Sequence, residues 1–219
     1  MNIKGKYYWL LLALPLFFVV WFFINNNHSK PLRTLAYFGK KNAFKKTDTV
    51  YHRVKPFCFI NQYNEKVTEE TVANKIYVTD FFFTTCQSIC PVMSTQLERV
   101  YKAFKNNPEV LIISHTVEPE IDSVPVLKQY AKLHGITNNQ WLFVTGDKKQ
   151  LYDMARTSYL LNNEVGNGDE NDFIHTQNFA LVDKERHLRG FYDGTDTADV
   201  SRLILEINLL LQEYDSNEK

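Results

Sequence analysis

The chain has 219 residues, of which 25 are Lys or Arg and 25 are Asp or Glu, so its formal net charge is zero. This balance, without a basic patch interleaved with aromatic residues, argues against a nucleic-acid partner. The chain beyond residue 30 is long enough for one domain with a full hydrophobic core.

Residues 7–24 form an uncharged, mostly apolar run that is long enough to cross a membrane as a helix. Lys4 and Lys6 precede the run, so the positive-inside rule places the N-terminus in the cytoplasm. A cleaved signal peptide is the alternative, which the length of the run and the lack of a small-residue cleavage site disfavour. We predict a single-pass anchor of the inner (cytoplasmic) membrane over residues 1–25, and a polar tether over 26–50. The domain that follows would face the periplasm or the cell exterior.

Residues 76–83 are rich in β-branched and aromatic side chains, which is typical of a buried strand. The run stops at Thr84 and Thr85, and Cys86 and Cys90 follow. Apolar residues then recur at helical spacing over 91–104. The two cysteines are therefore predicted at a junction of strand and helix, where α/β folds place chemistry.

The spacing of Cys86 and Cys90 puts both sulfurs on one side if the backbone coils between them. A helix N-terminus stabilises thiolates, so the pair could share a metal ion or form a disulfide that is redox-active. The alternatives are a purely structural disulfide or two inert buried thiols. Of the three cysteines, the remaining one is Cys58, which we expect to be a buried residue of a strand.

The rest of the chain alternates between strand and helix patterns. A helix capped by Asp122 or Ser123 should end at Gly135, and the polar segment 162–172 is predicted to be a mobile loop. Further strands are expected at 54–60, 110–114, 141–144, 178–183 and 187–192, and further helices at 147–155 and 197–214. This order predicts an α/β domain over residues 51–215 with a thioredoxin-like fold, in which helices flank a central mixed sheet.

Several segments resemble the Sco/SenC family, and the similarity extends from about residue 54 to the C-terminal helix. The most specific is the C-x-x-x-C-P element, since most thioredoxin-like redox proteins use C-x-x-C. The segments that carry the resemblance are 83–91, 113–114, 118–120, 127–131, 142–147 and 173–176.

The resemblance implies a membrane-tethered copper protein that helps to assemble the dinuclear copper centre of cytochrome c oxidase and reduces the receiving cysteines. By resemblance, the copper ligands would be Cys86, Cys90 and His175. The implied partner is the copper-accepting subunit of the oxidase or another periplasmic cuproprotein. Soft thiolates suit Cu(I), and an added imidazole keeps such a site competent for Cu(II).

The sequence departs from the family pattern at two positions beside these ligands. The family often has an aspartate directly before the histidine, where this chain has Ile174, so Asp172 is the candidate to support His175. The family's usual proline after the first cysteine is Gln87 here.

The other histidines are expected at the surface or at the ends of elements, and His115 is interpreted as a solvated or capping residue at a strand end. These histidines are His28, His52, His115, His134 and His187.

Two other classes of function stay open. A thiol–disulfide oxidoreductase or thiol peroxidase would cycle Cys86 and Cys90 without metal, and His175 would then be dispensable. A redox-responsive binding module would instead sense copper or oxidant and signal through the 162–172 loop.

Overall fold

The structure is a computed structural model that describes Trp21 and residues 34–39, 42–45, 48–162, 166, 169 and 172–217. The predicted membrane anchor lies outside the described residues apart from Trp21, and so does most of the predicted 162–172 loop. Within the described ranges, no helix is both long and apolar enough to span a bilayer.

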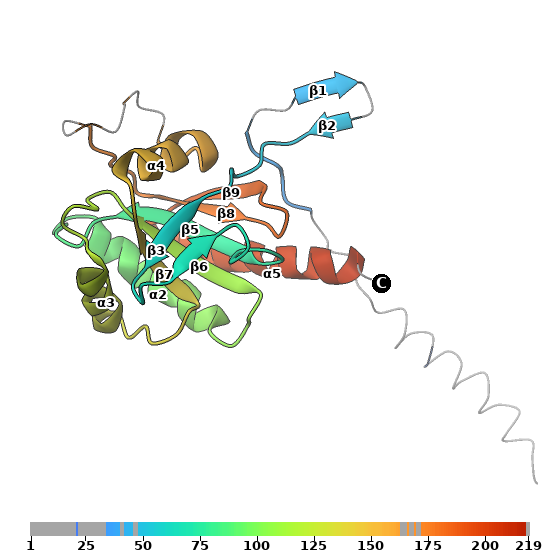
Figure 1. Cartoon of the computed structure of the whole chain (residues 1–219). Helices are drawn as coiled ribbons and strands as arrows, with labels where there is room; N and C mark the ends of the chain where they lie inside the picture. Colours follow the sequence, from blue (N-terminus) through green and yellow to red (C-terminus); the bar gives the residue numbers. More distant parts are fainter. Residues whose placement is uncertain are drawn as a thin grey trace, which may run out of the picture.

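The domain is built on a seven-stranded mixed sheet with the order β4-β3-β7-β6-β5-β8-β9 (Figure 1). Its centre is parallel and consists of β5 (Ile76–Phe82), β6 (Val110–Thr116) and β7 (Trp141–Thr145). Antiparallel strands extend the sheet on both sides: β3 (Cys58–Asn61), β4 (Lys66–Thr68), β8 (Asn178–Val182) and β9 (Leu188–Asp193). The predicted mixed sheet is therefore confirmed.

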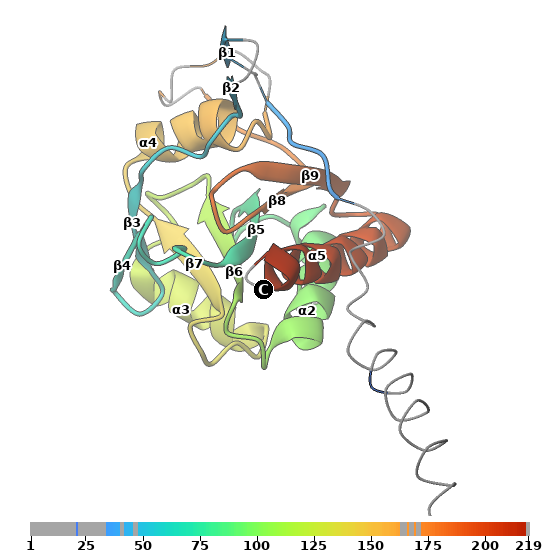
Figure 2. The ribbon, with the colours of Figure 1, turned by 90° about the vertical axis from the view of Figure 1, so that its right-hand side faces the viewer.

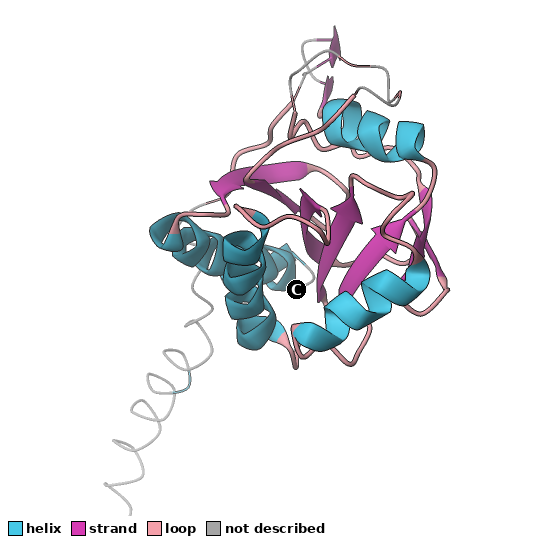
Figure 3. Ribbon diagram, turned by 90° about the vertical axis from the view of Figure 1, so that its left-hand side faces the viewer, coloured by secondary structure: helices cyan, strands magenta, loops and turns pink. Residues whose placement is uncertain are grey.

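Helices cover both faces of this sheet (Figures 2 and 3). One face carries α2 (Cys90–Phe104), α3 (Val124–Leu133) and α5 (Thr197–Asn217). The other carries α4 (Lys148–Asp153), which continues into the π-helical turn η2 (Met154–Ser158). Each face has its own apolar cluster, which explains why β5 is buried along its whole length.

Four local details differ from the predictions. The strand expected over 54–60 begins only at Cys58, and Cys58 is exposed, so its assignment as a buried residue is wrong. Side chains alternate along β3, and Cys58 falls on the solvent side while Phe59 is buried. The edge strand β4 was not predicted, since three residues are too short to show a period. Inside the predicted tether, β1 (Asn42–Lys45) and β2 (Asp48–Val50) form an antiparallel pair.

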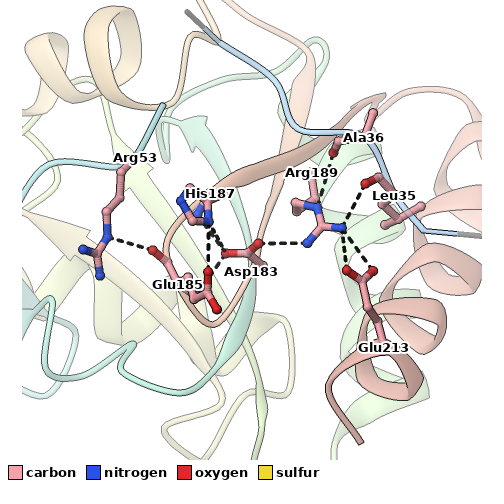
Figure 4. Close-up of polar contacts among 8 residues, drawn as sticks. All are labelled: Leu35, Ala36, Arg53, Asp183, Glu185, His187, Arg189 and Glu213. Carbon is pink, nitrogen blue, oxygen red and sulfur yellow. Dashed lines mark hydrogen bonds and ion pairs between the residues drawn. The ribbon is translucent and has the colours of Figure 1, made fainter. Parts of the chain in front are cut away.

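Residues 34–39, one of the described parts of the predicted tether, are docked on the domain. Their anchor is Arg189, which is 1% exposed and donates to the backbone carbonyls of Leu35 and Ala36 (Figure 4). The same guanidinium pairs with Asp183 and Glu213, so its buried charge is compensated. Residues 34–39 are thus tied to both the β8–β9 hairpin and α5.

Candidate dithiol and metal site

The cysteine turn, residues 83–90, connects the end of β5 to the start of α2. Cys86 lies in the turn, where its N–H donates to the carbonyl of Phe83 at 3.3 Å, and Cys90 is the first residue of α2. Pro91 lies in the first helical turn, where the absence of an N–H costs nothing. The predicted position of the pair at a strand–helix junction is confirmed.

The two thiols are buried against the apolar cluster that α2 covers, with Cys86 9% and Cys90 3% exposed. Both are free thiols, and each thiol shifts the pKa of the other. The Ser88 hydroxyl also lies 3.6 Å from the Cys86 sulfur.

The thiols of this pair have very different acidities. Burial raises the pKa of Cys86, but hydrogen bonds from Cys90 and Ser88 outweigh it and lower the pKa to about 7. Burial and the hydrogen bond to Cys86 together raise the pKa of Cys90 to about 12. Cys86 is therefore the more acidic thiol of the pair, and the thiolate is the form that attacks disulfides and binds metals.

A buried polar group that sequence reasoning missed lies near Cys90. Burial raises the pKa of Asp80 to about 7, and this carboxyl accepts a hydrogen bond from Ser114 at 2.5 Å. Ser114 in turn accepts from the indole of Trp141 at 2.9 Å. The negative charge of Asp80 also contributes to the raised pKa of Cys90. A single acidic residue inside the apolar run 76–83 was the available signal.

The predicted third ligand, His175, is exposed in the segment that precedes β8. Its neighbour Phe173 packs edge-on against Phe83 of the cysteine turn, with ring centroids 5.3 Å apart. Over the described residues, no three His, Cys, Asp or Glu side chains are grouped as a metal site. The structure brings Cys86 and Cys90 together and does not bring His175 into a group with them.

Asp172, the candidate support for His175, has another contact. Both of its carboxylate oxygens accept from Arg156, at 2.6 and 2.7 Å, in a largely buried bidentate pair. Since Arg156 belongs to η2, this pair ties the segment before His175 to the opposite face of the sheet from α2.

The interpretation of His115 as a solvated or capping residue is wrong. His115 lies inside β6 and is fully buried, with its ring stacked on Phe81 and its Nδ1 atom 3.1 Å from the hydroxyl of Thr79. The strand continues to Thr116, so this position faces the apolar cluster under α4, away from the cysteines. His28 lies outside the described residues, and His52, His134 and His187 are half-buried.

The fold and this site define a thioredoxin-like protein with a C-x-x-x-C dithiol. A sequence profile of the SCO1/SenC family matches residues 45–210. The chain is 30% identical over 162 residues to the SCO1 protein homolog of Bacillus subtilis, which covers 73% of this chain and 83% of that protein. The chain belongs to the SCO1/SenC family.

Solved structures agree with this assignment. BsSco, whose structure is described with a disulfide switch and as a member of the Sco family of cytochrome c oxidase assembly proteins, matches with a TM-score of 0.62 and 28% identity, covering 73% of this chain and 93% of that one. Copper-bound ScoI of Bradyrhizobium japonicum matches with a TM-score of 0.57 and 20% identity, covering 72% of this chain and 99% of that one. The second match supports the fold.

Proposed function

We propose that this chain is a membrane-anchored metallochaperone that delivers copper to the dinuclear copper centre of cytochrome c oxidase, reduces the cysteines of that centre, or does both. The carrying observation is the pair of free, buried thiols at the strand–helix junction of a SCO1/SenC chain. The similar solved structures include BsSco, a member of the Sco family of cytochrome c oxidase assembly proteins, and ScoI with copper bound. The client would be the copper-accepting subunit of the oxidase or another periplasmic cuproprotein.

In this proposal copper is cargo held by Cys86, Cys90 and His175. Two adjacent thiols supply the soft donors that Cu(I) prefers, and an imidazole would add the donor that suits Cu(II). His175 is exposed, and its neighbour Phe173 packs against Phe83 of the cysteine turn, which supports the imidazole as the third ligand. A site with so few protein ligands favours transfer of the ion to a partner by ligand exchange.

The membrane anchor over residues 7–24 is part of the same proposal. It would hold the domain on the periplasmic or exterior side of the cytoplasmic membrane. Residues 34–39 are docked on the domain by Arg189, so the stretch of chain between anchor and domain would be shorter than the predicted tether of 26–50.

The test is the copper content of the reduced full-length chain beside Cys86→Ser, Cys90→Ser and His175→Ala variants. One copper per chain is expected, lost in either cysteine variant and spectrally altered in the histidine variant. Cys58→Ser is the matched control, because that cysteine is exposed on β3 and should leave copper binding unchanged. Copper retained by both cysteine variants with unchanged absorption would overturn the assignment.

The second candidate is a thiol–disulfide oxidoreductase that works without metal. It is favoured by the Cys86 thiol, whose pKa of about 7 leaves a large thiolate fraction at neutral pH. Turnover with a dithiol reductant that is unaffected by His175→Ala, together with no retained copper, would select this candidate.

A further inference from the structure

Asp122 lies between the cysteine turn and the end of β6, and it is fully buried. From the turn it accepts the backbone N–H of Thr84, at 3.3 and 3.2 Å to its two oxygens, and the Thr84 hydroxyl. From β6 it accepts the hydroxyl of Thr116. One carboxylate thus connects two segments that are more than thirty residues apart in sequence.

This contact differs from the role that the sequence suggested. Ser123 occupies the N-cap of α3, and neither its side chain nor that of Asp122 caps the helix. Burying a carboxylate costs free energy unless hydrogen-bond donors surround it. The donors around Asp122 come from Thr84 and Thr116. The side chain therefore joins the cysteine turn to β6 instead of capping α3.

The loop that carries Asp122, residues 117–123, has two further ties, one to the end of β5 and one to the cysteine turn. The N–H of Val117 donates to the carbonyl of Phe82 at 2.9 Å, which extends the pairing of β5 and β6. The Thr85 hydroxyl donates to the carboxylate of Glu118 at 3.0 Å. The 117–123 loop therefore holds the chain directly before Cys86, from the end of β5 to Thr85. Asp122 is the buried side chain among these contacts.

We propose that Asp122 is a positioning residue for the dithiol: by holding Thr84 it fixes the start of the turn that brings the Cys86 sulfur to Cys90. Free rotation of this turn would lower the effective concentration of one thiol at the other. Loss of the Asp122 contacts would then weaken every property that requires the two sulfurs together. The inference rests on the proposed function only in taking Cys86 and Cys90 as the working pair.

The test measures the equilibrium between the dithiol and glutathione disulfide, in which the protein loses two electrons and two protons, one S–S bond forms, and one glutathione disulfide becomes two glutathione thiols. The full-length chain is used in detergent, in a Cys58→Ser background that leaves only the pair, and without copper. The oxidation constant is the equilibrium constant for oxidation of the dithiol by glutathione disulfide. For Asp122→Asn it should fall about tenfold, which corresponds to a reduction potential of the pair about 30 mV higher.

Two variants keep the test valid if Asp122→Asn does not fold. Thr84→Val removes the hydroxyl that Asp122 accepts and should lower the constant about threefold, as expected for one hydrogen bond. Thr84→Ser keeps that hydroxyl and should restore the constant to the value of the unmodified chain.

Asp183→Asn is the matched control for general destabilisation. Asp183 is also fully buried and accepts from the backbone of Glu185 and His187 and from Arg189, none of which belongs to the cysteine turn. It should lower the melting temperature without moving the oxidation constant. The proposal is overturned if Asp122→Asn and Thr84→Val leave the constant unchanged or raise it, or if Asp183→Asn lowers it equally. A chain that fails to bind copper still gives this measurement, so the two failures are distinguishable.

Discussion

His115 should make the stability of the domain dependent on pH, and His115→Phe should remove that dependence. Complete burial lowers the pKa of His115 from 6.5 to about 3, because the charged imidazolium cannot be solvated there. Its ring contacts Phe59, Phe81 and Tyr159 with centroids 5.0 to 5.4 Å away, so a phenyl ring suits the same site. The Thr79 hydroxyl keeps a partner in the variant, since it also donates to the carbonyl of Ile113.

The sign follows from the lowered pKa. Above pH 6.5 both folded and unfolded His115 are neutral, and the full stability is present. As pH falls from 6.5 toward 3, only the unfolded chain takes up the proton, so stability is lost. At about pH 4.5 the loss amounts to roughly 3 kcal/mol, from two pH units at about 1.4 kcal/mol each. At about pH 7.5 the variant should differ only by its lost hydrogen bond, about 1 kcal/mol.

The assay is urea unfolding of both proteins at the two pH values. The difference in unfolding free energy between them should change by about 3 kcal/mol in favour of His115→Phe on acidification. Tyr159→Phe is the matched control, because it alters the same cluster and its hydroxyl does not titrate in this range. A difference that stays constant between the two pH values would refute the burial argument for His115.

Other predictions concern contacts outside the dithiol. Arg189→Met leaves Asp183 and Glu213 without their cation and should cost about 3–5 kcal/mol in urea unfolding, with faster amide exchange at Phe38; a cost under about 1 kcal/mol would contradict the packing of residues 34–39. Arg156→Gln breaks the bidentate pair with Asp172 and should lower the free energy of unfolding in urea by about 1–3 kcal/mol. An unchanged free energy of unfolding would contradict this pair. Cys58→Ser should change stability by less than about 0.5 kcal/mol, and a larger loss would show that its sulfur is packed.

The central elements were predictable because their patterns are strong. The run 76–83 could be recognised as a strand from its β-branched and aromatic side chains, and the structure has β5 at Ile76–Phe82. The strands β6, β8 and β9 also lie where strands were expected, at 110–114, 178–183 and 187–192. Short edge strands were harder, because three or four residues do not establish a period, and β4 was missed for that reason.

The cysteine pair was predictable for a similar reason, since its spacing and its place after a strand are local features. The contacts of the pair were not. Asp122 precedes a helix, where acidic residues usually cap, and only the packing of the loop after β6 against the cysteine turn directs it to Thr84. The burial of His115 likewise depends on how far β6 continues, and strand ends are the least certain part of a sequence-based assignment.

Asp80 shows why these contacts follow from tertiary structure. In the parallel register of β5 and β6, Asp80 is opposite Ser114, and the serine hydroxyl can donate to its carboxylate. A slip of one residue would place Asp80 beside Ile113 or His115, whose side chains point to the other face of the sheet. The carboxyl near Cys90 would then be buried without its donor. The acidity of the Cys90 thiol is therefore set in part by the pairing of two strands, which no pattern within 76–91 contains.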